Sequence, residues 1–193
     1  MDPTSFLQAF LMLFVIFDPV GAVPIFQTFT GGFKEKEMER IARESVVIAS
    51  LLLFFFAFAG NFILDYLGVT VNDFMIAAGI VLFIFSIDFI TGTVESRTRR
   101  IEPESVAIVP IATPLLAGPG SIATVMYLMY EPFGPLQTAF AITVNAIIAY
   151  LIFRSSRKIF ALLGRNGTRI LSRIMGLLTA AIAISLIRRG LGF

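Results

Sequence analysis

A single carboxylate lies inside the first apolar stretch of the chain, residues 4–29, beside two prolines and a glycine. The segment reads Asp18-Pro19-Val20-Gly21-Ala22-Val23-Pro24, and Asp18 is the one charged residue of the stretch. A charge in such surroundings is expensive unless it is used, so Asp18 is a candidate partner for a coupling ion or for a substrate's ammonium group. The alternative is that Asp18 caps a helix end where the prolines interrupt the backbone.

A second apolar stretch, residues 105–130, repeats this pattern without a charge. It contains Thr113-Pro114-Leu115-Leu116-Ala117-Gly118-Pro119-Gly120-Ser121 and, one turn later, Thr124. Both stretches read polar residue, proline, four residues, proline. Thr113 takes the place of Asp18, and its hydroxyl could either ligate a cation or bond the loosened backbone. Ser121 and Thr124 could contact a substrate or simply cap the helix that starts there.

Each proline pair is expected to break its helix, because proline removes an amide donor and clashes with the preceding turn. Broken backbone is tolerated in a membrane only where protein or a water-filled cavity covers it, so the two breaks should face each other. The restarting helices would then offer N-terminal amides to a carboxylate, and the carbonyls before the breaks would suit an ammonium group or a cation. This arrangement predicts a site for a small zwitterion.

The predicted site consists of both motifs. The expected substrate contacts are Asp18, Pro19, Gly21, Pro24, Thr113, Pro114, Gly118, Pro119, Gly120, Ser121 and Thr124, and the expected ion-coupling residues are Asp18 and Thr113. Small residues at these positions could equally reflect close helix packing. No Lys or Arg lies deep in an apolar stretch, which favours a neutral amino acid over a phosphate or a dicarboxylate.

The chain has neither histidine nor cysteine. A Ser-His dyad, a His-ligated zinc site and a disulfide framework are therefore excluded. Paired motif-embedded aspartates of the intramembrane protease kind are also missing from the sequence. We expect no enzymatic activity, no catalytic residue, no cofactor, no nucleic-acid partner and no metal ion other than Na⁺ as a coupling ion.

The elements that must position these motifs are membrane-spanning helices. Of the 193 residues, 57% are hydrophobic and 15% are charged, whereas a soluble domain carries about 25% charged residues. With so few charges, the lipid bilayer must form the exterior. Stretches of the length that a spanning helix needs, about 20 apolar residues, lie at residues 4–29, 41–67, 71–91, 105–130, 136–153 and 170–187.

Basic residues collect in alternate loops between these six stretches. The first loop holds Lys34, Lys36, Arg40 and Arg43, and the third holds Arg97, Arg99 and Arg100. The fifth holds Arg154, Arg157, Lys158, Arg165, Arg169 and Arg173, and the last stretch is followed by Arg188 and Arg189. The loops at 68–70 and 131–135 hold none. By the positive-inside rule the odd loops face the cytoplasm, and both termini are predicted to lie outside it.

The two motifs are about half a chain apart, and the second and third stretches shifted by the same distance fall near the fifth and sixth. The fold class predicted is an all-α polytopic membrane protein of six transmembrane helices in one domain, residues 1–193. It would consist of two three-helix repeats, 1–95 and 96–193, each beginning with a broken helix. Because three is odd, the second repeat is inverted, as in many secondary transporters.

The two motifs together resemble those of the MarC family of bacterial and archaeal inner-membrane proteins, also called the neutral amino acid transporter family. The run Asp18-Pro19-x-Gly21-x-x-Pro24-Ile25-Phe26 matches that family's first-span pattern, and Pro114-Leu115-x-x-Gly118-Pro119-Gly120-Ser121-Ile122-x-Thr124 matches its fourth-span pattern. The resemblance covers essentially the whole chain. It implies a prokaryotic inner-membrane location and transport of small neutral amino acids such as glycine and alanine, coupled to Na⁺ or H⁺.

The chain departs from the family pattern at one position. Many members have Asn where this chain has Asp18, and a carboxylate can bind either Na⁺ or a proton whereas an amide cannot carry the proton. A passive channel or exporter of small solutes would share the broken helices, so this alternative to a carrier stays open at the level of sequence.

The remaining polar residues of the apolar stretches have ordinary explanations beside functional ones. Asp88 is expected to form an interfacial ion pair with Arg97 or Arg99. Asp65 and Asp73 are expected to be solvated at the outer interface. Asn61, Thr143 and Asn145 would either line the cavity or bond neighbouring helices, and the run Phe54-Phe55-Phe56 is expected to face lipid.

Overall fold

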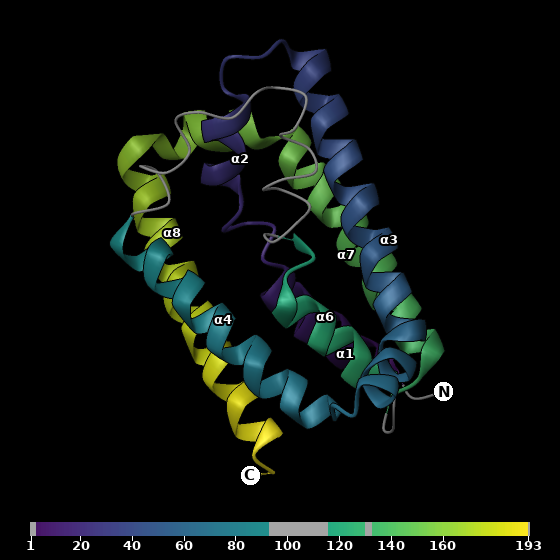
Figure 1. Cartoon of the computed structure of the whole chain (residues 1–193). Helices are drawn as coiled ribbons and strands as arrows, with labels where there is room; N and C mark the ends of the chain where they lie inside the picture. Colours follow the sequence, from purple (N-terminus) through teal and green to yellow (C-terminus); the bar gives the residue numbers. More distant parts are fainter. Residues whose placement is uncertain (1–2, 93–115, 130–132, 193) are drawn as a thin grey trace.

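A computed structural model describes residues 3–92, 116–129 and 133–192 (Figure 1). All regular structure in these ranges is helical. The helices are α1 (Pro3–Phe17), α2 (Val23–Thr30), α3 (Glu35–Leu67), α4 (Val71–Thr91), α6 (Pro119–Leu128), α7 (Pro135–Arg154) and α8 (Ser156–Gly190). Thr113, Pro114 and the basic loop with Arg97, Arg99 and Arg100 lie outside the described residues.

Four of the described helices are long and apolar enough to cross a bilayer. They are α3, α4, α7 and the part of α8 from Arg169 to Gly190, and α1 is a shorter apolar helix. They confirm that the stretches predicted at 41–67, 71–91, 136–153 and 170–187 are helices of spanning length. The first stretch forms two helices, α1 and α2, and the fourth is described only from residue 116 onward.

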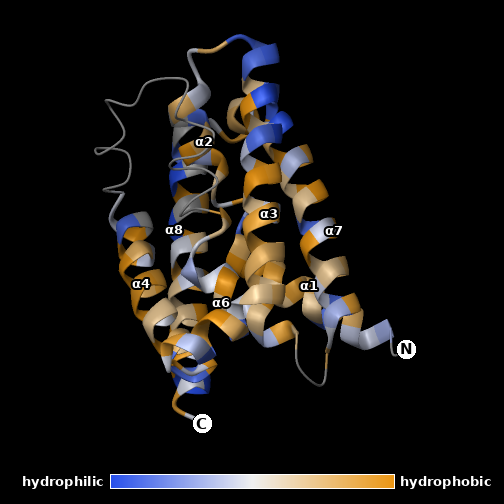
Figure 2. Ribbon diagram, turned by 45° about the vertical axis from the view of Figure 1, so that its right-hand side comes forward, coloured by the Kyte–Doolittle hydropathy of each residue, from blue (hydrophilic) through white to orange (hydrophobic). Residues whose placement is uncertain are grey.

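The surface of these helices exposes large apolar side chains, as expected for contact with lipid. On α3 the side chains of Leu51, Phe55, Phe58 and Phe62 are each more than half exposed, which would be unfavourable in water. Figure 2 shows hydrophobic residues along the middle of α3 and hydrophilic residues at its N-terminal end. Of the phenylalanine run, Phe55 is exposed, as a lipid-facing position requires, whereas Phe54 and Phe56 are half-buried.

The short turn between α3 and α4 follows from its residues. Gly68 ends α3 in the left-handed conformation, with φ of 70°, which glycine adopts without steric cost. Thr70 caps α4: its Oγ1 accepts the amide of Asp73 at 3.1 Å, and its own amide donates to the Asp73 carboxylate at 3.0 Å. Asp65 and Asp73 are both exposed, as predicted.

The predicted fifth loop is helical, which corrects the sequence expectation. Helix α8 begins at Ser156 and continues through the basic residues to Gly190, with a kink at Gly164, where φ is 63°. Figure 1 shows the part before the kink lying across one end of the bundle and the part after it running alongside α4. Glycine permits this change of direction, and the segment is helical although its basic residues interrupt the apolar pattern.

The helices associate in pairs. Figure 1 shows α3 beside α7 on one side of the molecule and α4 beside α8 on the other, with α1 and α6 between them. The α4–α8 pair is close because of glycine: a Cβ placed on Gly79 would lie 2.7 Å from the carbonyl oxygen of Ala183. Small residues at such crossings let backbones approach in the absence of a hydrophobic driving force between helices in lipid.

Polar contacts tie the basic end of the bundle together. The Gln27 amide on α2 donates to the Ser156 hydroxyl at 2.6 Å, and the Tyr150 hydroxyl donates to Glu39 at 2.9 Å. Phe26 on α2 stacks on Phe153 of α7, with ring centroids 4.7 Å apart. The Gln27 and Phe26 contacts hold the short helix α2 in place after the break that separates it from α1, and the Tyr150–Glu39 bond joins α7 to α3.

Replacing Gly79 by Ala is expected to destabilise the protein by about 1–2 kcal/mol, because the new methyl group overlaps a backbone carbonyl that cannot move freely. Replacing Gly32 by Ala is the matched control, since a Cβ there meets nothing within 4 Å. The measurement is the unfolding midpoint in mixed detergent micelles. A more stable Gly79→Ala variant, as helix propensity alone would give, would contradict this packing.

Candidate functional site

The first break is organised by Asp18. Helix α1 ends at Phe17, and Asp18 follows with φ of 42°, the one non-glycine residue with positive φ among those described. Its carboxylate accepts a hydrogen bond from the Gly21 amide at 2.9 Å. Asp tolerates the left-handed conformation because its short side chain bonds the local backbone in this way. Asp18 therefore stabilises the turn at the break, but it does not cap α2, whose N-cap residue is Ala22 and has no side-chain cap.

The break leaves part of the Asp18 carboxylate available. An ionised carboxylate has two oxygens and about four lone-pair sites, and one backbone hydrogen bond is formed to it. A cation or a donor could therefore still be bound. Gly21 is required beneath the carboxylate, because a Cβ at this position would overlap both of its oxygens.

The described part of the second motif differs from the expected capping arrangement. Helix α6 begins at Pro119, and its N-cap residue, Gly118, provides no side-chain cap. The Ser121 hydroxyl donates to the Leu116 carbonyl at 2.7 Å, and the Thr124 hydroxyl donates to the Gly120 carbonyl at 2.8 Å. Neither hydroxyl caps an amide, which corrects that alternative. Ser121 satisfies the Leu116 carbonyl, which precedes the extended Gly118, whereas Thr124 bonds back to a carbonyl inside the first turn of α6.

The two motifs lie together in the described structure. A Cβ placed on Gly120 would lie 3.1 Å from the Ile16 side chain, one turn or less before the first break, and 3.0 Å from Leu82 of α4. Ala22 and Ala117, from the two motifs, belong to the same buried cluster. Figure 1 shows the α1–α2 connection next to the start of α6, near the centre of the molecule. The small motif residues here serve close packing.

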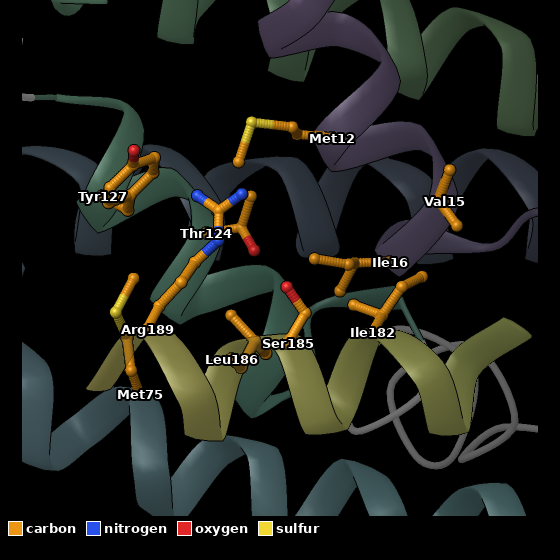
Figure 3. A pocket seen from close by; sticks show the side chains of 10 residues that line it. All are labelled: Met12, Val15, Ile16, Met75, Thr124, Tyr127, Ile182, Ser185, Leu186 and Arg189. Atoms are coloured by element: carbon orange, nitrogen blue, oxygen red, sulfur yellow. The ribbon is translucent and has the colours of Figure 1, made fainter. Parts of the chain in front are cut away.

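A cavity of about 180 Å³ lies beside the first break (Figure 3). Four helices, α1, α4, α6 and α8, form it, and its lining residues are Met12, Val15, Ile16, Met75, Thr124, Tyr127, Ile182, Ser185, Leu186 and Arg189. Of the residues predicted from the motifs, Thr124 alone contributes to this lining. The other described motif residues lie outside this lining, in the packed region around the proline motifs: Asp18, Pro19, Gly21, Pro24, Gly118, Pro119, Gly120 and Ser121.

Sequence reasoning missed the α8 wall of this cavity. The spacing of four residues places them on one helical face: Ile182, Ser185, Leu186 and Arg189. This spacing was the sequence pattern that could have indicated the cavity wall. Arg189 was assigned to the outer end of the chain as a topology marker, but its guanidinium reaches back over the ring of Tyr127, 5.3 Å from the ring centroid. A basic group therefore borders the cavity.

The other polar residues of the apolar stretches differ in their surroundings. The Asn145 amide on α7 donates to the Phe10 carbonyl of α1 at 3.3 Å and to Ala141 at 2.8 Å, as the helix-bonding alternative proposed. Thr143 is exposed. The Oδ1 atom of Asn61 is buried without a partner in the described ranges. Asp88 is half-buried, and its predicted arginine partners lie outside those ranges.

Comparison with known proteins identifies the family. The sequence model described as "MarC family integral membrane protein" matches residues 3–192. The chain belongs to the MarC family. It is 38% identical to a UPF0056 membrane protein of Methanocaldococcus jannaschii, covering 99% of this chain and 98% of that protein. It is 38% identical to another from Archaeoglobus fulgidus, over 96% and 92%, and 32% identical to YvbG of Bacillus subtilis, over 95% and 92%. No solved structure matches.

Membership of the MarC family establishes a multi-pass integral membrane protein, in agreement with the apolar helices described above. The names of these relatives state a membrane protein and no substrate. Within the described ranges, three or more Asp or Glu side chains do not gather in a group that could hold a metal ion. The polar group available at the break is the Asp18 carboxylate. The polar side chains of the cavity are those of Thr124, Tyr127, Ser185 and Arg189.

Substitutions of Asp18 separate its backbone role from its charge. Asp18→Asn should retain stability, because an amide oxygen can accept the Gly21 hydrogen bond and Asn tolerates positive φ. Asp18→Ala should cost about 2 kcal/mol, from loss of that hydrogen bond and from the left-handed backbone. Asp18→Gly should fall between them. The order is read from unfolding midpoints in detergent, and an Asn variant as unstable as the Ala variant would contradict it.

Proposed function

We propose that this MarC family protein is a secondary transporter that carries small neutral amino acids, of the glycine and alanine type, across the cell membrane. The observation that carries the proposal is the break at Asp18, where a carboxylate interrupts an apolar helix next to a cavity. An ionisable group of this kind inside a membrane bundle is a hallmark of ion or substrate pathways. Transport proceeds by alternating access, coupled to Na⁺ or H⁺.

The transporter is proposed to contain six spans in two inverted repeats. Two contacts support this organisation: α3 with α7, and α4 with α8. In each pair the two helices would be counterparts in the two repeats. Counterpart helices meet when the repeats are related by an axis that passes between them. Both broken segments then lie beside this axis, which is where transporters with inverted repeats bind their substrates.

The decisive test of transport is uptake of labelled glycine and alanine into proteoliposomes, with Na⁺ and proton gradients imposed separately. Saturable uptake driven by one of the two gradients, and accelerated exchange with internal unlabelled substrate, is expected for a carrier. Absence of uptake under both gradients refutes the transporter. Single-channel conductance or uptake without saturation would instead identify the passive channel or exporter.

Asp18 is proposed as the coupling group, since a carboxylate can bind Na⁺ or carry a proton. In Asp18→Asn proteoliposomes, uptake is expected to lose its dependence on a proton gradient, because the amide preserves the turn but cannot be protonated in the same range. Asp65→Asn is the matched control, as Asp65 is exposed at the end of α3. Unchanged ion dependence in the Asp18 variant would remove this residue from coupling.

The basic loops are proposed to face the cytoplasm, and this orientation can be tested directly because the chain lacks cysteine. The exposed residues Lys36 and Asn72 lie in the first turns of α3 and α4, at helix ends of opposite predicted sidedness, and each is replaced by a single cysteine. A membrane-impermeant maleimide should label Asn72→Cys in intact cells and label Lys36→Cys only after lysis, by the positive-inside rule. The reverse result would invert the proposed topology.

A further inference from the structure

The cavity beside the first break has one cationic group with unused donors. The Arg189 guanidinium lies over the Tyr127 ring, with Cζ 5.3 Å from the centroid. In the part of the chain that the structure describes, it forms no ion pair. The ring holds the planar group by a cation–π contact, which leaves its N–H donors free. These donors have the geometry that pairs with both oxygens of a carboxylate.

Two hydroxyls converge on the same space as the guanidinium. Figure 3 shows the hydroxyl of Ser185 directed into the cavity, and the guanidinium of Arg189 beside Thr124. Ser185 has no hydrogen-bond partner within the described ranges, so its hydroxyl can donate to an anion. The Thr124 hydroxyl donates its hydrogen bond to the Gly120 carbonyl at 2.8 Å. Towards the cavity it can therefore only accept a hydrogen bond.

The rest of the lining is apolar and sets the size of the occupant. Met12, Val15 and Ile16 come from α1, and Ile182 and Leu186 from α8. The volume of about 180 Å³ is close to that of engineered apolar cavities of about 150 Å³, which hold benzene, a molecule of six non-hydrogen atoms. A ligand of similar size with a short aliphatic group fits this space.

Acidic side chains do not contribute to the lining. The ammonium group of an amino acid would therefore find an acceptor in Thr124 but no opposite charge. The carboxylate, by contrast, meets a charge-assisted donor pair. The chemistry of the cavity recognises the carboxylate and the aliphatic group more strongly than the ammonium group.

We propose that this cavity is a carboxylate-binding site for small aliphatic acids, in which Arg189 and Ser185 hold the carboxylate and the α1 and α8 side chains enclose the aliphatic group. The inference rests on the proposed transport function and deepens it, because it names where the carboxylate of a substrate is bound. An α-ammonium group is tolerated but not required.

The test uses three ligands of one shape: L-alanine, isobutyrate and isopropylamine. Isobutyrate replaces the ammonium of alanine by methyl, and isopropylamine replaces the carboxylate by methyl. Binding of labelled L-alanine and of labelled isobutyrate to the purified full chain is measured by scintillation proximity, with each unlabelled compound as competitor. Isobutyrate is expected to bind and to compete with alanine, and isopropylamine is not. Competition by isopropylamine, or absence of isobutyrate binding, overturns the proposal.

Matched variants assign the site to Arg189. Arg189→Gln should weaken isobutyrate binding by roughly tenfold or more, as expected for loss of a charge-assisted pair. Arg188 is exposed, as Arg189 is, but lies outside the lining, so Arg188→Gln makes the same change in net charge and should leave binding unaltered. Ser185→Leu fills the cavity without changing charge and should abolish binding. Equal effects of the two arginine variants would show a general surface charge effect and overturn the proposal.

Failure of this inference is distinguishable from failure of transport. If labelled alanine is taken up normally by both Arg189→Gln and Ser185→Leu proteoliposomes, transport stands and the cavity is not its carboxylate site. If isobutyrate binds with the expected dependence on Arg189 but uptake is absent under every gradient, the binding site stands and the transporter is refuted. Gel filtration and circular dichroism show whether each variant is folded. If Arg189→Gln does not fold, the result for Ser185→Leu decides whether the cavity is the binding site.

Discussion

The constraint on which this structure depends is that lipid offers no hydrogen bonds to a broken backbone. A helix can be interrupted inside the bundle only if the freed groups are satisfied locally, and the described residues show how this is done. Asp18 adopts a left-handed conformation and accepts the Gly21 amide, and the Ser121 hydroxyl donates to the Leu116 carbonyl just before α6. The same polar residues that suggest chemistry are thus needed for the fold.

Close packing follows from this constraint, because a break must also be shielded from lipid. Gly120 brings α6 against Ile16 and Leu82, Gly60 accommodates Met126, and Gly79 brings α4 against the backbone of α8. In lipid such contacts rely on dispersion and shape, since hydrophobic association is absent. The glycines therefore set how near the helices approach around the broken segment, and the cavity is the space that remains between α1, α4, α6 and α8.

Helix α1 links the two places where ligands can act. Its last turn leads into the carboxylate of Asp18, and one face of it, with Met12, Val15 and Ile16, forms a wall of the cavity that Arg189 borders. Any rearrangement of the break would move this wall, because the residues are within one or two turns of each other. In the proposed transporter, this single short helix would couple binding in the cavity to ion binding at Asp18.

The sequence alone determined the membrane-spanning character, the position of the break at Asp18 and the family, because hydrophobic length, proline chemistry and motif spacing are local properties. It also placed Asp18 correctly at a break while leaving its role open. Only the tertiary structure decided that Ser121 and Thr124 bond carbonyls, that the basic segment before Arg169 is helical, and that Arg189 turns back over Tyr127 to border a cavity. These features depend on which helix faces which, and that is set by packing between residues far apart in the chain.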